Sequence, residues 1–405
     1  MYPPFHHLLL LLLLFVVHGT TGIPTWNYTS SGRVSMQELE RIQQYLAKVN
    51  KPAVKTIQSV EGDVVDCVPI HKQLAFDHPA LKNHKLQVAP SMPKSLERRE
   101  KNYGVSENRV FAAWPPAPGC PKGTVPIRRI TVDDVLRAGS LYRFIGKEAN
   151  QVGKLEHAVA VYNATPGNIH GGSATLNVWN PVVEGDNEFS ASQIWISGGK
   201  AGQRYETVRA GWQVYPQMYG DYRTRIFSHW TIDGSQSTGC YDVLCSGFVQ
   251  VSRNIFPGMI ISNISVYDGD QLIFEMGIWK AKKTGDWWMG YEKEPIGYWP
   301  HELFQYLNSS ADLIKWGGEI ANNNPNNRHT TTQMGSGSFA DEGWGKASFF
   351  NSLKIFDLNN FIPITPFPYT QTENNNCYNI IVDKKDEVWG TFFYYGGDGL
   401  NKNCS

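Results

Sequence analysis

Short runs of β-branched and aromatic residues recur about every ten residues from position 155 onward, and this spacing is the strongest constraint on the fold. Gly, Asn, Asp and Pro, which favour turns, separate the runs. The runs cover residues 157–162, 175–179, 192–197, 208–215, 225–231, 247–251, 271–279, 287–291, 347–356 and 391–395. Such regular strands predict an all-β domain, an antiparallel β-sandwich or barrel, and we expect the sandwich over residues 154–405. The stretch 303–316 is the one short helix expected inside it.

The first part of the chain has a mixed pattern. Ser35 and Glu38 have the spacing of a capping box, apolar residues follow at helical spacing to Val49, and Pro52 ends the helix. Short β-like runs follow between residues 57 and 68. We therefore expect a small α+β domain over residues 23–128, followed by a connector over residues 129–153.

Charge and composition exclude several classes of protein. The chain has 37 Lys and Arg against 37 Asp and Glu, so it carries no electrostatic footprint for nucleic acid or for an anionic membrane surface. Charged residues are only 18%, and the chain contains 38 Gly, 19 Tyr, 19 Phe and 13 Trp. This balance is more typical of an extracellular β-protein than of a cytosolic helical one. We expect no nucleic-acid partner, no membrane partner and a monomer.

The N-terminal apolar run, residues 8–17, is too short to span a bilayer, which needs about 20 residues. Its length and the small residues at 19–22 match a secretory signal peptide over residues 1–22. The alternative is a buried N-terminal strand. No other apolar run is long enough to span, so we expect a secreted, extracellular protein.

Six cysteines form an even set in this secreted context, and no Cys-x-x-Cys pair or paired His spacing indicates zinc. We therefore expect disulfides, with no metal and no cofactor. Six cysteines allow 15 pairings, and the sequence alone does not choose among them, although Cys240 and Cys245 bracket a short turn. The cysteines are Cys67, Cys120, Cys240, Cys245, Cys377 and Cys404. Five Asn-x-Ser/Thr sequons predict N-glycosylation at Asn27, Asn163, Asn263, Asn308 and Asn403.

No common catalytic motif is present: the sequence has no Gly-x-Ser-x-Gly elbow, P-loop or His-Glu-x-x-His. The remaining acid–base candidates lie in two predicted strands. Side chains alternate along a strand, so Glu206 shares a mostly apolar face of 205–216, while Arg209 lies on the opposite face. In the strand 315–320, Glu319 lies opposite Trp316. Composition alone favours Arg209 and Glu319 as solvated sheet charges or a structural ion pair.

A series of short motifs nevertheless occurs in a distinctive order. They are residues 193–196, 210–216, 219–221, 238–242, 245–250, 297–300, 316–319, 332–337 and 396–397. With these motifs the chain resembles the neprosin family of plant secreted proteins, over roughly residues 57–404. Upstream, residues 61–67 and 76–79 resemble the activation peptide of that family.

The resemblance implies a secreted zymogen with a removable prodomain, residues 23–128, and a β-sandwich glutamic peptidase that cleaves after proline at acid pH. In such an enzyme one Glu activates water as general base, and a second, protonated Glu polarises the scissile carbonyl or protonates the leaving amine. The two groups must lie close together, because only then are their pKa values pushed apart. The resemblance also implies the disulfides Cys240–Cys245 and Cys377–Cys404, which leaves Cys67–Cys120 for the prodomain.

The two catalytic positions of the family carry over unequally. Glu319, in Trp-Gly-Gly-Glu, matches the second catalytic Glu, but the position of the first is occupied by Arg209. An Arg beside Glu319 would lower its pKa and remove the protonated partner. Glu206 lies three residues upstream and points to the other face unless a bulge re-aims it.

Three functions follow as alternatives. The first is a Pro-directed glutamic endopeptidase, in which Glu319 acts with Glu206 or another acid on a proline-containing peptide or protein. The second is a neprosin-like pseudoenzyme that binds peptide or cell-wall ligands without cutting them. The third, suggested only by aromatic residues and Gly, is a lectin-like or wall-structural sandwich.

Several further side chains are candidates for the groove. The aromatic ones, expected either to accept proline or to fill the core, are Trp195, Tyr215 and Trp299. Gln193 and Gln333 are candidate polar groups of the cleft, the alternative being surface amides.

Overall fold

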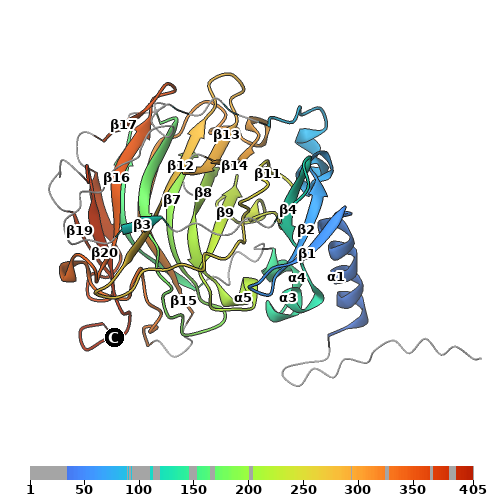
Figure 1. Ribbon diagram of the computed structural model, residues 1–405. Helices are drawn as coiled ribbons and strands as arrows, with labels where there is room; N and C mark the ends of the chain where they lie inside the picture. Colours follow the sequence, from blue (N-terminus) through green and yellow to red (C-terminus); the bar gives the residue numbers. More distant parts are fainter. Residues whose placement is uncertain are drawn as a thin grey trace, which may run out of the picture.

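Two large β-sheets pack face to face and form the body of the protein (Figure 1). The structure is a computed structural model, and it describes residues 34–88, 90, 93, 110–112, 119–145, 153–164, 169–199, 204–292, 294–323, 328–364, 368–382 and 389–404. The expected signal peptide, 1–22, and the sequon at Asn27 lie outside these residues. Within the described residues, no helix is both long enough and apolar enough to cross a membrane.

The first sheet has seven strands in the order β10-β9-β8-β7-β15-β5-β18. Their bounds are β5 Lys154–Asn163, β7 Ser190–Gly199, β8 Tyr205–Val214, β9 Arg225–Thr231, β10 Cys240–Tyr241, β15 Leu313–Asn322 and β18 Tyr369–Thr372. All of its pairings are antiparallel. The strands predicted at 205–216 and 315–320 are therefore confirmed as β8 and β15.

The second sheet has ten strands, most of them in the order β11-β14-β13-β12-β6-β16-β20-β19. The bounds are β6 Gly171–Asn177, β11 Val249–Gln250, β12 Gln271–Lys280, β13 Trp287–Tyr291, β14 Glu294–Trp299, β16 Ser348–Phe356, β19 Asn379–Val382 and β20 Phe393–Gly396. Two short strands join it at the side: β17 Phe361–Pro363 pairs with β16, and β3 Val110–Ala112 pairs in parallel with β12.

The core lies between the two sheets, because each strand turns alternate side chains inward. Fully buried Val208 and Trp212 of β8 belong to the same apolar cluster as Leu176 of β6 and Phe274 of β12. Burial of each such side chain contributes about 1.5–3 kcal/mol. The predicted antiparallel β-sandwich is confirmed, and the face of the first sheet that carries Arg209 is left outside this core.

The N-terminal region is the expected small α+β unit, on one side of the sandwich (Figure 1). Helix α1, Met36–Val49, begins as predicted at Ser35, whose Oγ accepts the N–H of Glu38 at 3.1 Å. A three-stranded sheet follows, formed by β1 Lys55–Gln58, β2 Val64–Pro69 and β4 Thr124–Arg128. The 3-10 turns η1 Ile70–Lys72, η2 Leu74–Asp77 and η3 Pro79–Leu81 complete it. Two short helices, α3 Val132–Arg137 and α4 Leu141–Phe144, lie in the expected connector, residues 129–153.

A buried ion cluster fastens this unit to the sandwich. Arg225 of β9 is fully buried, and its Nη1 lies 2.7 Å from Asp63 Oδ2 in the turn between β1 and β2. Its Nη2 lies 2.6 Å from Asp221 Oδ2. Gln73 and Gln250 add a second, uncharged link. The side-chain amide of Gln73 donates to the backbone carbonyl of Gln250 at 2.8 Å, and its side-chain oxygen accepts the backbone N–H of Gln250 at 2.8 Å. The prodomain-like unit is thus held by specific polar contacts and not only by packing.

All six cysteines are paired. The bonds are Cys67–Cys120, Cys240–Cys245 and Cys377–Cys404, which confirms the pairing that the family resemblance implies. The first lies within the N-terminal unit and the other two lie within the sandwich. No disulfide therefore crosses between the two parts.

The prediction of a helix over residues 303–316 is wrong. Only the 3-10 turn η4, His301–Leu303, forms there, and β15 already begins at Leu313. The amide N–H groups of Gln305, Tyr306 and Leu307 donate to the carboxylate of Glu206 and not to carbonyls of a helix. The remaining short helices of the sandwich are α5, Pro216–Tyr219, and η5, Ala340–Glu342.

Candidate functional site

A cavity of about 450 Å³ lies on the face of the seven-stranded sheet that points away from the core. Strands β5, β7, β8, β9 and β15 form its floor, and α4 and α5 close one end with Phe144 and Met218. Its lining side chains include His157, Trp195, Ser197, Thr207, Arg209, Tyr215, His229, Thr231, Tyr241, Lys315 and Glu319. Its size is within the range of small-ligand sites.

The register of the strands aligns four of these residues in one row across the floor. Lys315 of β15 lies opposite Trp195 of β7, Trp195 lies opposite Arg209 of β8, and Arg209 lies opposite His229 of β9. Directly opposed residues in a sheet point to the same face. The row therefore places three nitrogen-bearing side chains and one indole ring in the cavity.

Two glycines of the family motifs are required by the backbone beneath the site. Gly317 has a φ of +146°, and a Cβ there would lie 2.2 Å from the carbonyl oxygen of Ala158 in β5. A Cβ on Gly211 would lie 2.0 Å from the carbonyl oxygen of Ser192 in β7. Only glycine tolerates such close approach. Gly317 therefore permits the close pairing of β15 with β5, and Gly211 permits the close pairing of β8 with β7.

Glu319 is the centre of a hydrogen-bonded cluster in which both carboxylate oxygens are engaged. Oε2 lies 3.0 Å from Arg209 Nη1 and accepts a hydrogen bond from Gln193 Nε2 at 2.7 Å. Oε1 lies 3.1 Å from His157 Nε2, and His157 Nδ1 lies 3.2 Å from Glu373 Oε1. Glu319 is only 2% exposed, so solvent screens these contacts little.

Charge decides the protonation state of Glu319. Burial alone raises the pKa of this carboxyl, but the Arg209 charge, the bond from His157 and the bond from Gln193 outweigh it and lower the pKa to about 2. An arginine side chain does not lose its proton in proteins. Glu319 is thus held as a carboxylate even in moderately acidic solution.

His157 is one of several site residues that were not among the candidates from the sequence; Glu373, His229 and Tyr241 are others. Burial lowers the pKa of His157, but its bonds to Glu319 and Glu373 outweigh burial and raise the pKa to about 9. His157 lies opposite Glu319 because β5 pairs with β15. The sequence contains the histidine at the start of a predicted strand, but nothing in it shows that this strand is the neighbour of β15.

We expect the His157 imidazole to titrate near pH 9 in the folded chain, well above the ordinary histidine value of about 6.5. Replacing Glu373 with Gln removes one of the two carboxylates that stabilise the imidazolium and should lower this pKa. Side-chain NMR titration of the wild type and the Glu373→Gln variant measures both values. A His157 pKa at or below the ordinary value in the wild type would contradict the cluster.

Glu206 lies on the other face of β8 and does not meet Glu319. Its carboxylate is fully buried and accepts the N–H groups of Tyr306 at 2.8 Å and Leu307 at 2.9 Å, and Arg204 Nε lies 2.9 Å away. The pairing of β8 with β7 runs without a register shift from Tyr205 to Val214. The bulge that could have re-aimed Glu206 is absent from this pairing, so Glu206 anchors a loop.

Replacing Glu206 with Gln should therefore lower stability and leave the cavity unchanged. A neutral amide presents one acceptor oxygen to donors that now share a carboxylate, and we expect a loss of about 2 kcal/mol in the free energy of unfolding. Urea denaturation measures the loss, and the His157 NMR signal reports the cavity. A displaced His157 signal in a folded Glu206→Gln chain would contradict the anchoring role.

The structure separates the other candidate residues of the groove. Trp195 and Tyr215 line the cavity, and Gln193 lies beneath it against Glu319. Trp299 instead lies in the core, with no exposed surface, against Phe248 at a ring-centroid distance of 5.0 Å. Its expected role in the groove is wrong, because β14 belongs to the opposite sheet.

Gln333 is also displaced from the expected cleft. It lies in the loop after β15, where its side-chain oxygen accepts the N–H of Val182 at 2.9 Å and its own N–H donates to the Val182 carbonyl at 2.8 Å. It joins two loops and is not among the residues that line the cavity. Its expected position as a polar group of the cleft is therefore corrected to a loop contact.

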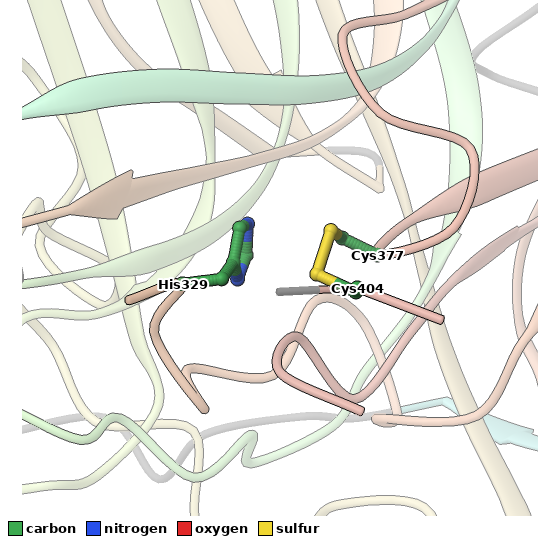
Figure 2. Close-up of side chains that lie close together, drawn as sticks. All are labelled: His329, Cys377 and Cys404. Carbon is green, nitrogen blue, oxygen red and sulfur yellow. A yellow bond between two sulfur atoms is a disulfide. The ribbon is translucent and has the colours of Figure 1, made fainter. Parts of the chain in front are cut away.

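A second cluster on the sandwich brings His329 close to Cys377 and Cys404 (Figure 2). The two sulfurs form a disulfide, so neither is a thiolate. His329 Nε2 lies 3.2 Å from Glu156 Oε2, and both side chains are buried. The cluster is a structural contact around the disulfide.

The chain matches two family models and is similar to several solved structures. The family model described as Neprosin matches residues 186–398, more than half of the chain, and the model described as Neprosin activation peptide matches residues 56–170. Among solved structures, Scytalido-glutamic peptidase with a peptide-based transition state analog is 13% identical, with a TM-score of 0.32, over 61% of this chain and 98% of that chain. SCP-B, a member of the Eqolisin family of peptidases in a complex with the tripeptide Ala-Ile-His, is 13% identical, with a TM-score of 0.31, over 60% and 97%. CG-16, a homodimeric agglutinin from chicken liver, is 8% identical, with a TM-score of 0.22, over 40% and 93%.

Proposed function

Because this chain belongs to the neprosin family, we propose that it is a peptide-binding member whose hydrolytic step is disabled at Arg209. Family membership supports a peptidase-like function and a peptide as the ligand. The observation that carries the proposal is the ion pair between Arg209 and Glu319, 3.0 Å apart on the cavity floor. These two residues occupy the positions at which the family resemblance implies two catalytic glutamates.

A glutamic peptidase needs one carboxylate that accepts a proton and one carboxyl that donates it. Arg209 does not supply the donor, because its guanidinium keeps its proton throughout. Glu319 is a poor base, because its pKa of about 2 lies far below that of a base matched to weakly acidic or neutral solution. Three of its roughly four acceptor positions are already taken by Arg209, Gln193 and His157.

The alternative is an active endopeptidase that cleaves after proline at acid pH. One observation favours it: Glu319 and Glu373 contact the same imidazole, that of His157, so two carboxylates do lie around one proton-carrying group. In that arrangement His157 separates the two carboxylates, which are therefore not paired directly. The geometry gives this alternative less support than it gives the binding function.

We further propose that the protein is a secreted, monomeric glycoprotein with a signal peptide over residues 1–22, a prodomain over residues 23–128 and a connector over residues 129–153. Three disulfides are compatible with an oxidising compartment. The four described sequon residues are exposed, as glycosylation requires; they are Asn163, Asn263, Asn308 and Asn403.

The binding function is tested by calorimetric titration of the full chain with proline-containing peptides, followed by mass spectrometry of the recovered peptide. We expect saturable binding and an intact peptide. In the Thr207→Trp variant a larger side chain fills the cavity. Loss of the heat signal in this variant would show that the peptide binds in the cavity. Absence of binding to every peptide would contradict the proposal.

A further inference from the structure

We propose that the cavity selects acidic peptides, with a carboxylate of the ligand bound between Lys315 and Arg209 over the Trp195 ring. This inference rests on the proposed function, in which the ligand is a peptide, and it adds the chemistry of the residue that the cavity recognises.

The charged side chains that line the cavity are predominantly cationic. Arg143, Arg209 and Lys315 are basic, and Glu319 is the one carboxylate among the described lining residues. His157 adds a positive charge at neutral pH, because its pKa is about 9, but Glu319 and Glu373 offset this charge and that of Arg209, so Lys315 is left without a carboxylate partner. A concave site lined by one sign of charge attracts ligands of the opposite sign.

Lys315 is the group in this set that has no counterion. No other residue that the structure describes makes a hydrogen bond or an ion pair with its ammonium group. It is half-buried on β15, directly opposite Trp195. Its ammonium is therefore free to pair with a carboxylate of a bound ligand.

Two polar atoms of other cavity residues, one on β8 and one on β9, also lack partners in the described part of the chain. Arg209 Nε and His229 Nδ1 are buried and form no hydrogen bond with any described residue. His229 is 5% exposed, and burial together with the Arg209 charge lowers its pKa well below the ordinary value, so it stays neutral. Buried polar atoms are nearly always hydrogen-bonded in native structures. Both side chains line the cavity, which leaves its floor with unused hydrogen-bonding capacity.

The spacing of the strands sets the length of the recognised unit. Lys315 and Arg209 lie on strands separated by β7, so their backbones are about 9–10 Å apart, two strand spacings of about 4.8 Å. Trp195 lies between them, and Tyr215 and Tyr241 form an adjacent aromatic wall. A Glu or Asp side chain can reach the cations while the neighbouring residue of the peptide packs on these rings.

The test compares two capped peptides that differ only in Glu-Pro against Gln-Pro. Their dissociation constants for the full chain are measured by fluorescence polarisation at neutral pH. We expect the Glu peptide to bind about tenfold more tightly, because a hydrogen-bonded charge contact contributes about 1.4 kcal/mol or more. In Lys315→Met this preference should fall to about twofold or less, whereas Lys315→Arg, which keeps the charge, should retain it. The matched control is Lys122→Met, an exposed lysine outside the cavity, which should behave as the wild type.

Equal affinity for the two peptides in the wild type would overturn the inference and leave the binding function intact. Tighter binding of an oligogalacturonate than of the Glu peptide would overturn it in favour of an acidic polysaccharide. Cleavage of either peptide, read by mass spectrometry in the same samples, would instead refute the loss of hydrolysis, and the charge preference would then be measured in Glu319→Gln. If neither peptide binds, both proposals fail.

Discussion

An Arg209→Glu variant is expected to cleave proline-containing peptides in acid solution, where the wild-type chain leaves them intact. The substitution places a second carboxyl beside Glu319, at the position where the family resemblance calls for one. Two carboxyls in contact cannot both ionise readily, so one pKa rises and supplies the protonated acid that the wild type lacks. General acid–base catalysis contributes about 10²–10⁴-fold, and we expect a gain of at least about 10²-fold in hydrolysis rate over the wild type.

The control for this gain is the double variant Arg209→Glu, Glu319→Gln, which keeps one carboxyl only and should be inactive. The rates are measured by chromatography of a quenched peptide, with cleavage sites assigned by mass spectrometry. The cut should follow proline and disappear near neutral pH. An inactive Arg209→Glu chain that is folded and still binds peptide would show that more than this one position disables the site.

Removing the Arg209 charge without replacing it should destabilise the fold strongly at neutral pH. In Arg209→Leu the Glu319 carboxylate stays buried and keeps only His157 as a charged partner. Loss of one member of a buried ion pair costs about 3–5 kcal/mol, and we expect the lower end, about 3 kcal/mol, because His157 still compensates in part. Chemical denaturation of the variant and the wild type measures the difference, and Arg253→Leu, at an exposed position, is the matched control.

The pH dependence of that loss follows from the pKa of Glu319. This pKa falls from 4.5 to about 2 on folding, so the ion pair contributes its full stability above about pH 4.5 and loses it as the pH falls through about 2. The difference between the wild type and Arg209→Leu should therefore be constant at neutral pH and should shrink below about pH 4. A difference that grows on acidification would contradict the buried carboxylate. Adding Glu319→Gln to Arg209→Leu should recover much of the loss, because no buried charge then remains unpaired.

The alternation of side chains along two strands predicted the faces on which Arg209 and Glu319 lie, and the family resemblance singled out the two residues as the centre of the site. Arg209 and Glu319 were each assigned from period-two patterning to the face opposite the apolar one, and the structure brings them together at 3.0 Å. The same patterning kept Glu206 on the other face, and its continuous pairing with β7 maintains it there. Local pattern predicts which face a side chain takes, because that depends only on its own strand.

Pairing between distant strands could not be predicted in the same way. His157 reaches Glu319 only because β5, formed 162 residues earlier in the chain, is the neighbour of β15. Trp299 is aromatic, as expected of a groove residue, but β14 belongs to the other sheet and its side chain lies in the core. The stretch 303–316 was expected to be a helix, but the buried Glu206 carboxylate accepts the N–H groups of residues 305–307. Each of these outcomes depends on a contact made in the folded protein between residues far apart in sequence.

The most direct measurement is mass spectrometry of proline-containing peptides after incubation with the acid-treated wild-type chain, beside the Glu319→Gln chain. We expect both chains to leave every peptide intact over the time in which Arg209→Glu completes its cleavage. Cleavage after proline by the wild type, abolished by Glu319→Gln, would contradict it and establish an active peptidase despite Arg209.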